Sequence, residues 1–164
     1  MGTLAPSRTS LSHMAPGRCQ ASVFSKVLIK NVGLNETRTG LLKVLLKMNA
    51  DIEIINQKKI FNESCGDLIV KSSDLEGINV PDYIIPNIID EIPILCIAAC
   101  FAKGCTVIKN ASELKIKESD RLKATSEGLE AINVKHDLLD DGLIIEGSDK
   151  EITPLEEIDS FGDH

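Results

Sequence analysis

Five charged side chains fall within seven residues near the middle of the chain, in the sequence KIKESDR at residues 115–121. The residues after Asp120 have the pattern of a helix, and acidic side chains suit a helix N-terminus, whereas Lys117 and Arg121 oppose the macrodipole there unless an anion lies between them. A guanidinium binds phosphate or carboxylate in a bidentate manner, and an ammonium adds a mobile point charge. Glu118, placed between the two cations, would be the group that moves protons. The pattern indicates an anion-binding site with a catalytic carboxylate, and the alternative is a solvated helix start with local Lys–Glu pairing.

A second carboxylate, Asp90, precedes another expected helix. Pro93 is tolerated only near a helix start, and Lys103 with the following glycine is typical of a helix end, so a helix is predicted over residues 91–103. Asp90 then lies at or next to the N-cap, as Glu118 does before the helix that begins near Asp120. Each helix would aim a carboxylate from its N-terminus, although a plain N-cap also explains Asp90.

The elements that carry these carboxylates repeat along the chain. KVLIKN at residues 26–31 returns as CTVIKN at residues 105–110, and both have the composition of a short strand. Each is followed by a stretch with leucines at helical spacing, by an asparagine suited to a left-handed cap (Asn49 or Asn133), and by a pair of strands. The strands stand 79 residues apart and the asparagines 84, so the second copy holds about five more residues before its helix. Those residues fall on SELKIKES, which suggests a loop lengthened for function.

Composition excludes several classes of protein. The 164 residues are 43% hydrophobic and 26% charged, which predicts one ordinary globular core. A net charge of -7, with no basic stripe carrying interleaved aromatic residues, argues against a nucleic-acid partner. The longest apolar run, residues 92–102, is too short to span a bilayer, so no membrane association is predicted. Anionic small molecules remain suitable ligands because they need only a local cationic site.

The five cysteines favour a reduced compartment, such as the cytoplasm. Their number is odd, and neither a CxxC pair nor a metal-ligand spacing with histidine occurs. Cys96 and Cys100 stand four residues apart on the helix expected at residues 91–103. We therefore expect them to be small buried hydrophobic residues and not a redox pair.

The stretch ELKIKESDRL resembles the signature of the 5-enolpyruvylshikimate-3-phosphate synthase (3-phosphoshikimate 1-carboxyvinyltransferase) family. IDEIPILCIAACFAKG and NVGLNETRTGLLKVLLKMNADIEI resemble other parts of the same family, so the resemblance is continuous from about residue 22 to the end. It implies an α/β fold (α+β by some schemes) in which two domains, each an inside-out α/β barrel of three βαβαββ units, enclose the active site.

The resemblance also predicts how this chain is divided. Residues 1–21 contain no Asp or Glu and no hydrophobic periodicity, and they look like a cloning leader more than a transit peptide. Residues 22–148 would form two βαβαββ-type units of the C-terminal domain. Residues 149–164, which end in IDSFGDH, look like the start of a third unit that stops within a GDHR pattern.

The family's reaction moves the enolpyruvyl group of phosphoenolpyruvate onto the 5-hydroxyl of shikimate 3-phosphate and releases phosphate, as a step toward chorismate and the aromatic amino acids. By this resemblance Glu118 transfers the proton at the methylene carbon, and Asp90 contacts the 5-hydroxyl as base or orienting group. Lys117 would lie between the two substrates, and Arg121 would bind phosphoenolpyruvate. The two substrates are the implied partners, and neither a metal nor an organic cofactor is implied.

Several cationic residues of the family's site have no counterpart in this chain, so an incomplete and inactive fragment is expected. An enzyme like UDP-N-acetylglucosamine enolpyruvyl transferase is one alternative, because that family shares the architecture and the chemistry. A non-catalytic binding module on the same scaffold is another. Surfaces that would face further units are expected to stay apolar and to favour self-association of the fragment.

Overall fold

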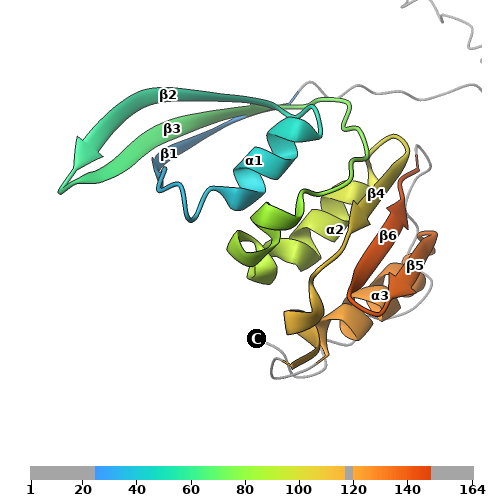
Figure 1. Cartoon of the computed structure of the whole chain (residues 1–164). Coiled ribbons are helices and arrows are strands. Elements are labelled where there is room, and N and C mark those ends of the chain that lie inside the picture. Colours follow the sequence, from blue (N-terminus) through green and yellow to red (C-terminus); the bar gives the residue numbers. More distant parts are fainter. Residues whose placement is uncertain (1–24, 117–119, 149–164) are drawn as a thin grey trace, which may run out of the picture.

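The structure, a computed structural model, describes residues 25–116 and 120–148. Strands and short helices alternate along it, as Figure 1 shows. In chain order the elements are β1 (Lys26–Gly33), α1 (Gly40–Lys47), β2 (Asp51–Ile60), β3 (Glu63–Lys71), the 3-10 helices η1 (Asp82–Asn87) and η2 (Ile89–Glu91), α2 (Ile92–Cys100), β4 (Cys105–Ile108), the 3-10 helix η3 (Ser112–Ile116), α3 (Arg121–Ala131), β5 (His136–Leu139) and β6 (Gly142–Glu146).

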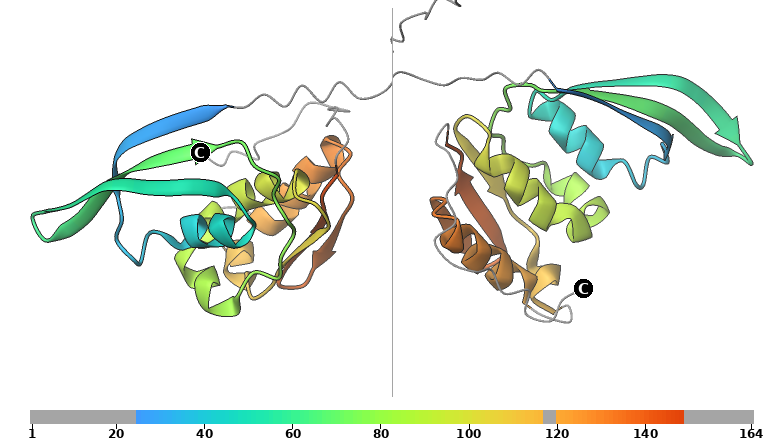
Figure 2. Two further views of the ribbon diagram at one scale, coloured as in Figure 1. Left: turned by 90° about the horizontal axis from the view of Figure 1, so that it is seen from above. Right: turned by 180° about the vertical axis from the view of Figure 1, so that it is seen from behind.

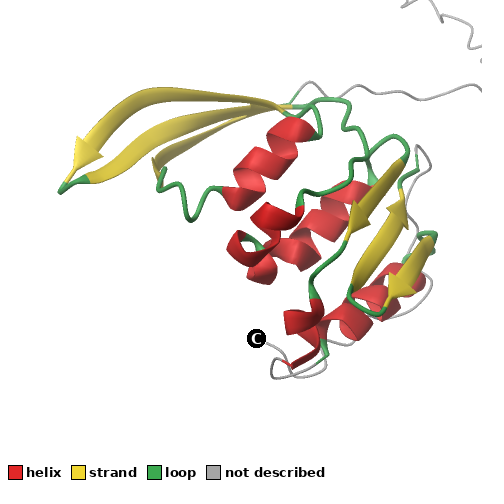
Figure 3. Cartoon of the chain, viewed as in Figure 1, coloured by secondary structure: helices red, strands yellow, loops and turns green. Residues whose placement is uncertain are grey.

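Two antiparallel sheets of the same design confirm the predicted repeat. The first has the strand order β1-β3-β2 and the second the order β4-β6-β5, so in each the last strand of the copy lies between the other two. A helix connects the first two strands of each copy, α1 in one and α3 in the other. The first sheet is the longer one and projects beyond the helices, while the second lies against α2 and α3 (Figures 1 and 3).

Left-handed asparagines mark matching points of the two copies. Asn49 has φ 69° and Asn133 has φ 57°, which confirms the predicted caps after the two helices. Asn31, at the register shift within β1, and Asn110, two residues after β4, have φ 55° and 58°. Asparagine adopts this conformation more readily than most residues because its short side chain can bond locally. The repeat is thus visible in backbone angles as well as in sequence.

The backbone N–H groups of Asn31 and Asn110 each donate a hydrogen bond to an aspartate side chain. The backbone N–H of Asn31 donates to Asp67 Oδ1 at 2.9 Å, and the backbone N–H of Asn110 donates to Asp141 Oδ2 at 2.9 Å. Asp67 also accepts from Asn56 Nδ2 at 2.8 Å. Both bonds lower the pKa of Asp67, with the Asn56 bond the larger cause, because they favour the ionised carboxylate. In the first sheet the register of both strand pairs shifts beside Asn31 and Asn56. The Asp67 carboxylate, which binds both residues, therefore stabilises the irregular part of this sheet.

The second copy contains a further strand-like segment and a second helix. Residues 75–80 run beside β4, with parallel bridges from Glu76 to Lys103 and from Asn79 to Val107. Taken with α2, β4, α3, β5 and β6, this segment gives the order βαβαββ. In the first copy the described residues give only β1, α1, β2 and β3.

The helix predicted over residues 91–103 is shorter in the structure. It begins at Ile92 and ends at Cys100. Lys103 does not continue the helix because its backbone bonds to the strand-like segment: its N–H donates to Leu75 O, and its carbonyl accepts from Gly77 N, both at 2.8 Å. The expected end at Lys103 was therefore wrong by three residues. Within the described residues, no helix is long and apolar enough to cross a membrane.

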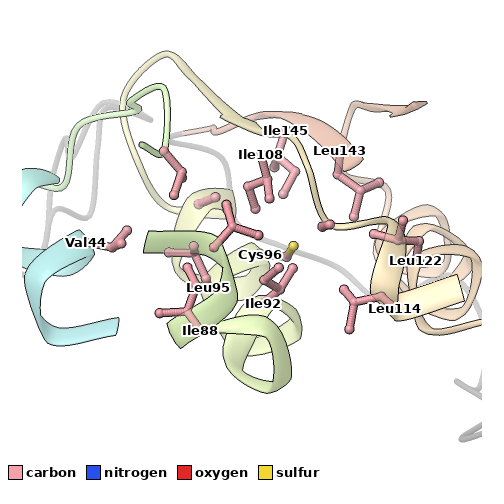
Figure 4. Packing of buried hydrophobic residues seen from close by; sticks show 14 of the residues in the cluster. Val44, Ile88, Ile92, Leu95, Cys96, Ile108, Leu114, Leu122, Leu143 and Ile145 are labelled. Atoms are coloured by element: carbon pink, nitrogen blue, oxygen red, sulfur yellow. The ribbon is translucent and has the colours of Figure 1, made fainter. Parts of the chain in front are cut away.

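The hydrophobic core lies between α1, η1, α2, α3 and the second sheet. Figure 4 shows side chains of α2 pointing toward the strands on one side and toward α1 on the other. Ile92, Leu95 and Cys96 are fully buried there, as are Leu122 and Leu129 of α3. Because α2 contributes buried residues on several faces, it is the central helix of the described part.

Cys96 and Cys100 are buried, as the sequence predicted. Burial raises the pKa of the Cys96 thiol to about 12 and that of Cys100 to about 11. Cys105 is exposed and Cys65 is half-buried.

Alkylation of the native protein with iodoacetamide at pH 8 should therefore be selective. Because the thiolate is the nucleophile, a shift of three pKa units lowers its fraction on the order of 1,000-fold. Among the four cysteines that the structure describes, we expect Cys105 to be modified first and Cys96 and Cys100 only after unfolding, as measured by peptide mass spectrometry. Modification of Cys96 at the rate of Cys105 in the folded protein would contradict this packing.

Candidate active site

The beginnings of α2 and α3, which were predicted to carry the site, lie on the same side of the molecule as the beginning of α1. In Figure 1 the N-terminal ends of α1, α2 and α3 all lie on the side opposite the turn between α2 and β4. The 3-10 helices η2 and η3, which precede α2 and α3, lie next to each other. Unpaired N–H groups at helix beginnings carry partial positive charge, so this side favours an anion.

Asp90 lies in η2, one residue before the N-cap of α2, which is Glu91. The position next to the cap agrees with the sequence prediction. No side-chain cap bond forms at this helix start. The carboxylate of Asp90 is instead 64% exposed and contacts a residue from the other predicted site element.

That residue is Arg121, whose Nη1 donates to Asp90 Oδ1 at 3.1 Å. The two residues are 31 positions apart in the sequence, and the fold brings them together across η2 and η3. Arg121 is only 22% exposed, so the neighbouring elements fix the direction of its guanidinium, while Asp90 remains accessible. An accessible carboxylate beside a held guanidinium can bind both a hydroxyl and an anionic group.

Arg121 and Lys123 both lie in the first turn of α3, but their side chains have different partners. Asp120 is the N-cap and accepts from the Lys123 backbone N–H at 3.1 Å, as predicted for a helix that begins there. The Lys123 ammonium lies 3.6 Å from Glu127, one turn further along the helix, and both are well exposed. Lys123 therefore extends along the helix flank, away from Asp90.

Lys117 and Glu118 lie outside the described residues, so the predicted lysine and glutamate are not placed. The segment that leads to them is fixed by η3, which holds most of the extra residues of the second copy. Leu114 of η3 is fully buried, and its N–H donates to Ala111 O at 3.0 Å. A buried leucine inside the charged stretch thus anchors the inserted loop on the core.

The sequence prediction did not include the loop before α1, a helix that packs on η1. A Cβ at Gly40, the first residue of α1, would lie 3.2 Å from Asn87 O and would overlap the Ile88 side chain. Glycine therefore lets the start of α1 approach the end of η1. Arg38, on this loop, is exposed and lies two residues before the start of α1. The sequence did contain a signal of this close contact: Gly40 stands at a helix start, where a side chain is normally tolerated.

A separate shallow depression of about 420 Å³ lies at the C-terminal half of α3, and none of the predicted site residues lines it. There His136 Nδ1 donates to Val134 O at 2.8 Å, and Nε2 lies 2.8 Å from the Ser126 hydroxyl. Ser126 lies inside α3, where backbone N–H groups are used by the helix and cannot form an oxyanion hole. This serine–histidine pair therefore braces α3 against β5.

Comparison with known proteins identifies the family. The family model described as EPSP synthase (3-phosphoshikimate 1-carboxyvinyltransferase) matches residues 19–164. The chain belongs to the EPSP synthase family. Among curated EPSP synthase relatives, the 3-phosphoshikimate 1-carboxyvinyltransferase of Petrotoga mobilis is 51% identical over 140 residues, which cover 85% of this chain and 32% of the relative. That of Thermodesulfovibrio yellowstonii is 50% identical over 141 residues, with the same coverage of both chains.

A solved structure agrees with this assignment. The EPSP synthase of Acinetobacter baumannii superposes with a TM-score of 0.79 at 39% identity, covering 85% of this chain and 33% of that chain. The α/β enolpyruvyl transferase fold implied by the sequence resemblance is thereby confirmed. The chain spans about a third of the length of the curated relatives it matches.

Proposed function

We propose that this chain supplies one half of an EPSP synthase active site, the half that carries a proton-transfer glutamate and a phosphoenolpyruvate-binding arginine. The whole protein would transfer the enolpyruvyl group of phosphoenolpyruvate to the 5-hydroxyl of shikimate 3-phosphate. The family match favours this reaction over that of a UDP-N-acetylglucosamine enolpyruvyl transferase.

The transfer needs one proton movement at the hydroxyl group and two at the methylene carbon. The 5-hydroxyl oxygen bonds to C2 of phosphoenolpyruvate, loses its proton to a base, and the methylene carbon gains a proton from an acid. The tetrahedral adduct then loses phosphate as the C–O bond to the phosphate breaks and a proton leaves the methyl group. Glu118 is proposed as the group that donates and later removes the carbon-bound proton, and Asp90 as the group that receives or orients the hydroxyl proton.

The cations have a complementary role. Both substrates are strongly anionic, and Lys117 and Arg121 would stabilise the charge that develops on the adduct and on departing phosphate. Lys117 would lie between the substrates, and Arg121 would hold the carboxylate or phosphate of phosphoenolpyruvate. The observation that carries the proposal is the Arg121–Asp90 contact at 3.1 Å, since it joins two residues named independently by the sequence patterns.

A chimeric enzyme tests the roles of these two residues. In the Petrotoga mobilis relative, the 140 matched residues would be replaced by their counterparts from this chain. Arg121→Ala should raise KM for phosphoenolpyruvate, because a charge-assisted bond to substrate is worth about 1.5 to 3 kcal/mol, or roughly 10- to 150-fold. Asp90→Asn should lower kcat more than it changes either KM.

The stability of the Arg121→Ala and Asp90→Asn variants must change little if the two residues act in substrate binding and proton transfer. Because the Asp90 side chain is 64% exposed, solvent screens the ion pair, which then contributes about 0 to 1 kcal/mol, and both variants should unfold near the wild-type temperature. If Arg121→Ala left every kinetic constant unchanged, the pair would be structural and the assignment wrong. The chain by itself should release no phosphate from the two substrates, since it would lack the groups of the opposite half-site.

A further inference from the structure

Strand β2 lies at the border of the first sheet and is long. Among the described residues it pairs only with β3, and its counterpart β5 in the second copy pairs only with β6. β2 has ten residues, whereas β5 has four. In Figure 2 the view from above shows β2 along one border of the first sheet and β1 along the other. At roughly 3.4 Å per residue, a strand edge of about 34 Å is therefore open to pairing with another strand.

A complete repeat unit would still leave the β2 edge open. In the second copy, residues 75–80 run beside β4, and the matching place in the first copy is the β1 edge, on the opposite border from β2. Residues 1–24 contain two prolines and neither Asp nor Glu, so as a strand they would present no carboxylate to the lysines at the end of β2. The occupant of this edge must come from elsewhere.

The charges of β2 are divided between its two halves. Glu53 stands in the first half and Lys58 in the second, and both are exposed. Glu53 pairs with Ile69 of β3, and Lys58 pairs with Cys65. Because positions 65 and 69 are four residues apart on one strand, Glu53 and Lys58 lie on the same face of the sheet. The register shift that follows Ile55 makes this possible for two residues five positions apart.

We infer that the β2 edge is the interface of a symmetric dimer, in which β2 pairs antiparallel with β2 of a second copy of this chain. With Glu53 opposite Lys58 of the second copy, the two-fold axis also places Lys58 opposite Glu53 of that copy. Opposite charges on directly facing residues stabilise an antiparallel pair. The charge pattern of β2 is thus complementary to itself when the strand direction is reversed.

The tip of the β2–β3 hairpin would contact the second copy. Phe61 is 99% exposed, although its side chain is large and apolar, and Ile60 before it is 41% exposed. Phe61 and Asn62 have φ 46° and 68°, the left-handed pair of a tight hairpin turn, which a bulky residue seldom adopts. In the proposed register Ile60 lies opposite Asp51 of the second copy, and Phe61 lies beside Ala50 of that copy. Dimerisation would therefore cover part of an apolar tip that is exposed in the single chain.

Sedimentation equilibrium of the full chain tests for the dimer. One pair of ten-residue strands is smaller than a standard interface, so we expect a Kd of about 1 to 100 µM. Because salt screens exposed charges, raising NaCl from about 0.05 to about 0.5 M should increase Kd by about threefold or more. A folded chain that stays monomeric at about 1 mM, or a dimer whose Kd does not increase with salt, would overturn the proposal.

An exchange of charges tests which strands pair. Lys58→Glu would place a carboxylate opposite each Glu53, and Glu53→Lys would place an ammonium group opposite each Lys58. Each variant alone should therefore raise Kd by about tenfold or more. An equimolar mixture of the two should form a heterodimer with nearly the wild-type Kd, since every facing pair again has unlike charges. Variants that dimerise as tightly as the wild type, or a mixture that associates no more tightly than the single variants, would contradict pairing through β2.

Lys30→Glu is the matched control. Lys30 lies on β1, at the other border of the sheet. Besides the larger effect of the Asn56 hydrogen bond, the charges of Lys58 and Lys30 both lower the pKa of Asp67, so the control makes a similar change near that carboxylate without altering β2. It should change Kd by less than about threefold. Weakening as strong as that in Lys58→Glu would mean that the net charge of the chain governs association, and the β2 interface would be wrong.

Discussion

Glu118→Gln in the chimeric enzyme should lower kcat by about 100- to 10,000-fold, since this is the range lost when a general acid–base group is removed. The amide keeps the size of the carboxyl group but can neither donate a proton to the methylene carbon nor remove one from the methyl group of the adduct. Lys117→Ala should fall in the same range if the ammonium stabilises the adduct. Steady-state phosphate release at saturating substrates measures both.

Two neighbouring lysines are the controls for this prediction. Lys115 belongs to η3, and Lys123 pairs with Glu127 along the flank of α3. Alanine at either position should leave kcat nearly unchanged and alter stability by no more than about 0.5 kcal/mol. Equal and small effects at Lys117, Glu118 and both control positions would mean that the stretch is a solvated helix start.

Gly142→Ala should destabilise the fold by about 1 to 3 kcal/mol or more, the cost of overpacking against atoms that cannot move easily. A Cβ at Gly142 would overlap the carbonyl oxygen of Ile108, which is backbone of the paired strand β4. Alanine also restricts the unfolded chain, which returns about 0.4 to 1 kcal/mol and offsets part of that cost. Urea unfolding followed by circular dichroism measures the balance.

Gly33→Ala provides the matched comparison for Gly142. Nothing lies within 4 Å of a Cβ at Gly33, and Gly33 is also a strand residue. Its substitution should be neutral or stabilise slightly. A loss of stability at Gly33 as large as that at Gly142 would show that strand flexibility, and not close packing on Ile108, governs these positions.

The repeat could be predicted because it depends on sequence patterns that act over a few neighbouring residues. Apolar strand patterns, leucines at helical spacing and the cap residues Asn49 and Asn133 each act over a few residues, and both caps have the expected left-handed backbone. The burial of Cys96 and Cys100 followed from the same local pattern.

Features that depend on distant parts of the chain could not be predicted. The end of α2 is set by backbone bonds from Lys103 to Leu75 and Gly77, which no helical pattern reveals. The contact between Asp90 and Arg121 likewise follows from the packing of η2 beside η3. The burial of Leu114 was not predicted because the residue lies within a charged stretch. A single leucine among charged residues was nevertheless a sign that the loop is anchored on the core.

Phosphate release by the chimeric enzyme from phosphoenolpyruvate and shikimate 3-phosphate tests the proposed half-site most directly. Because the rest of the Petrotoga mobilis relative would supply the opposite half-site, the residues of this chain are the only part exchanged. We predict turnover within about tenfold of the unaltered relative, a difference of about 1.4 kcal/mol in activation free energy. A chimera that folds cooperatively and binds shikimate 3-phosphate, yet releases phosphate no faster than the enzyme-free blank, would contradict it.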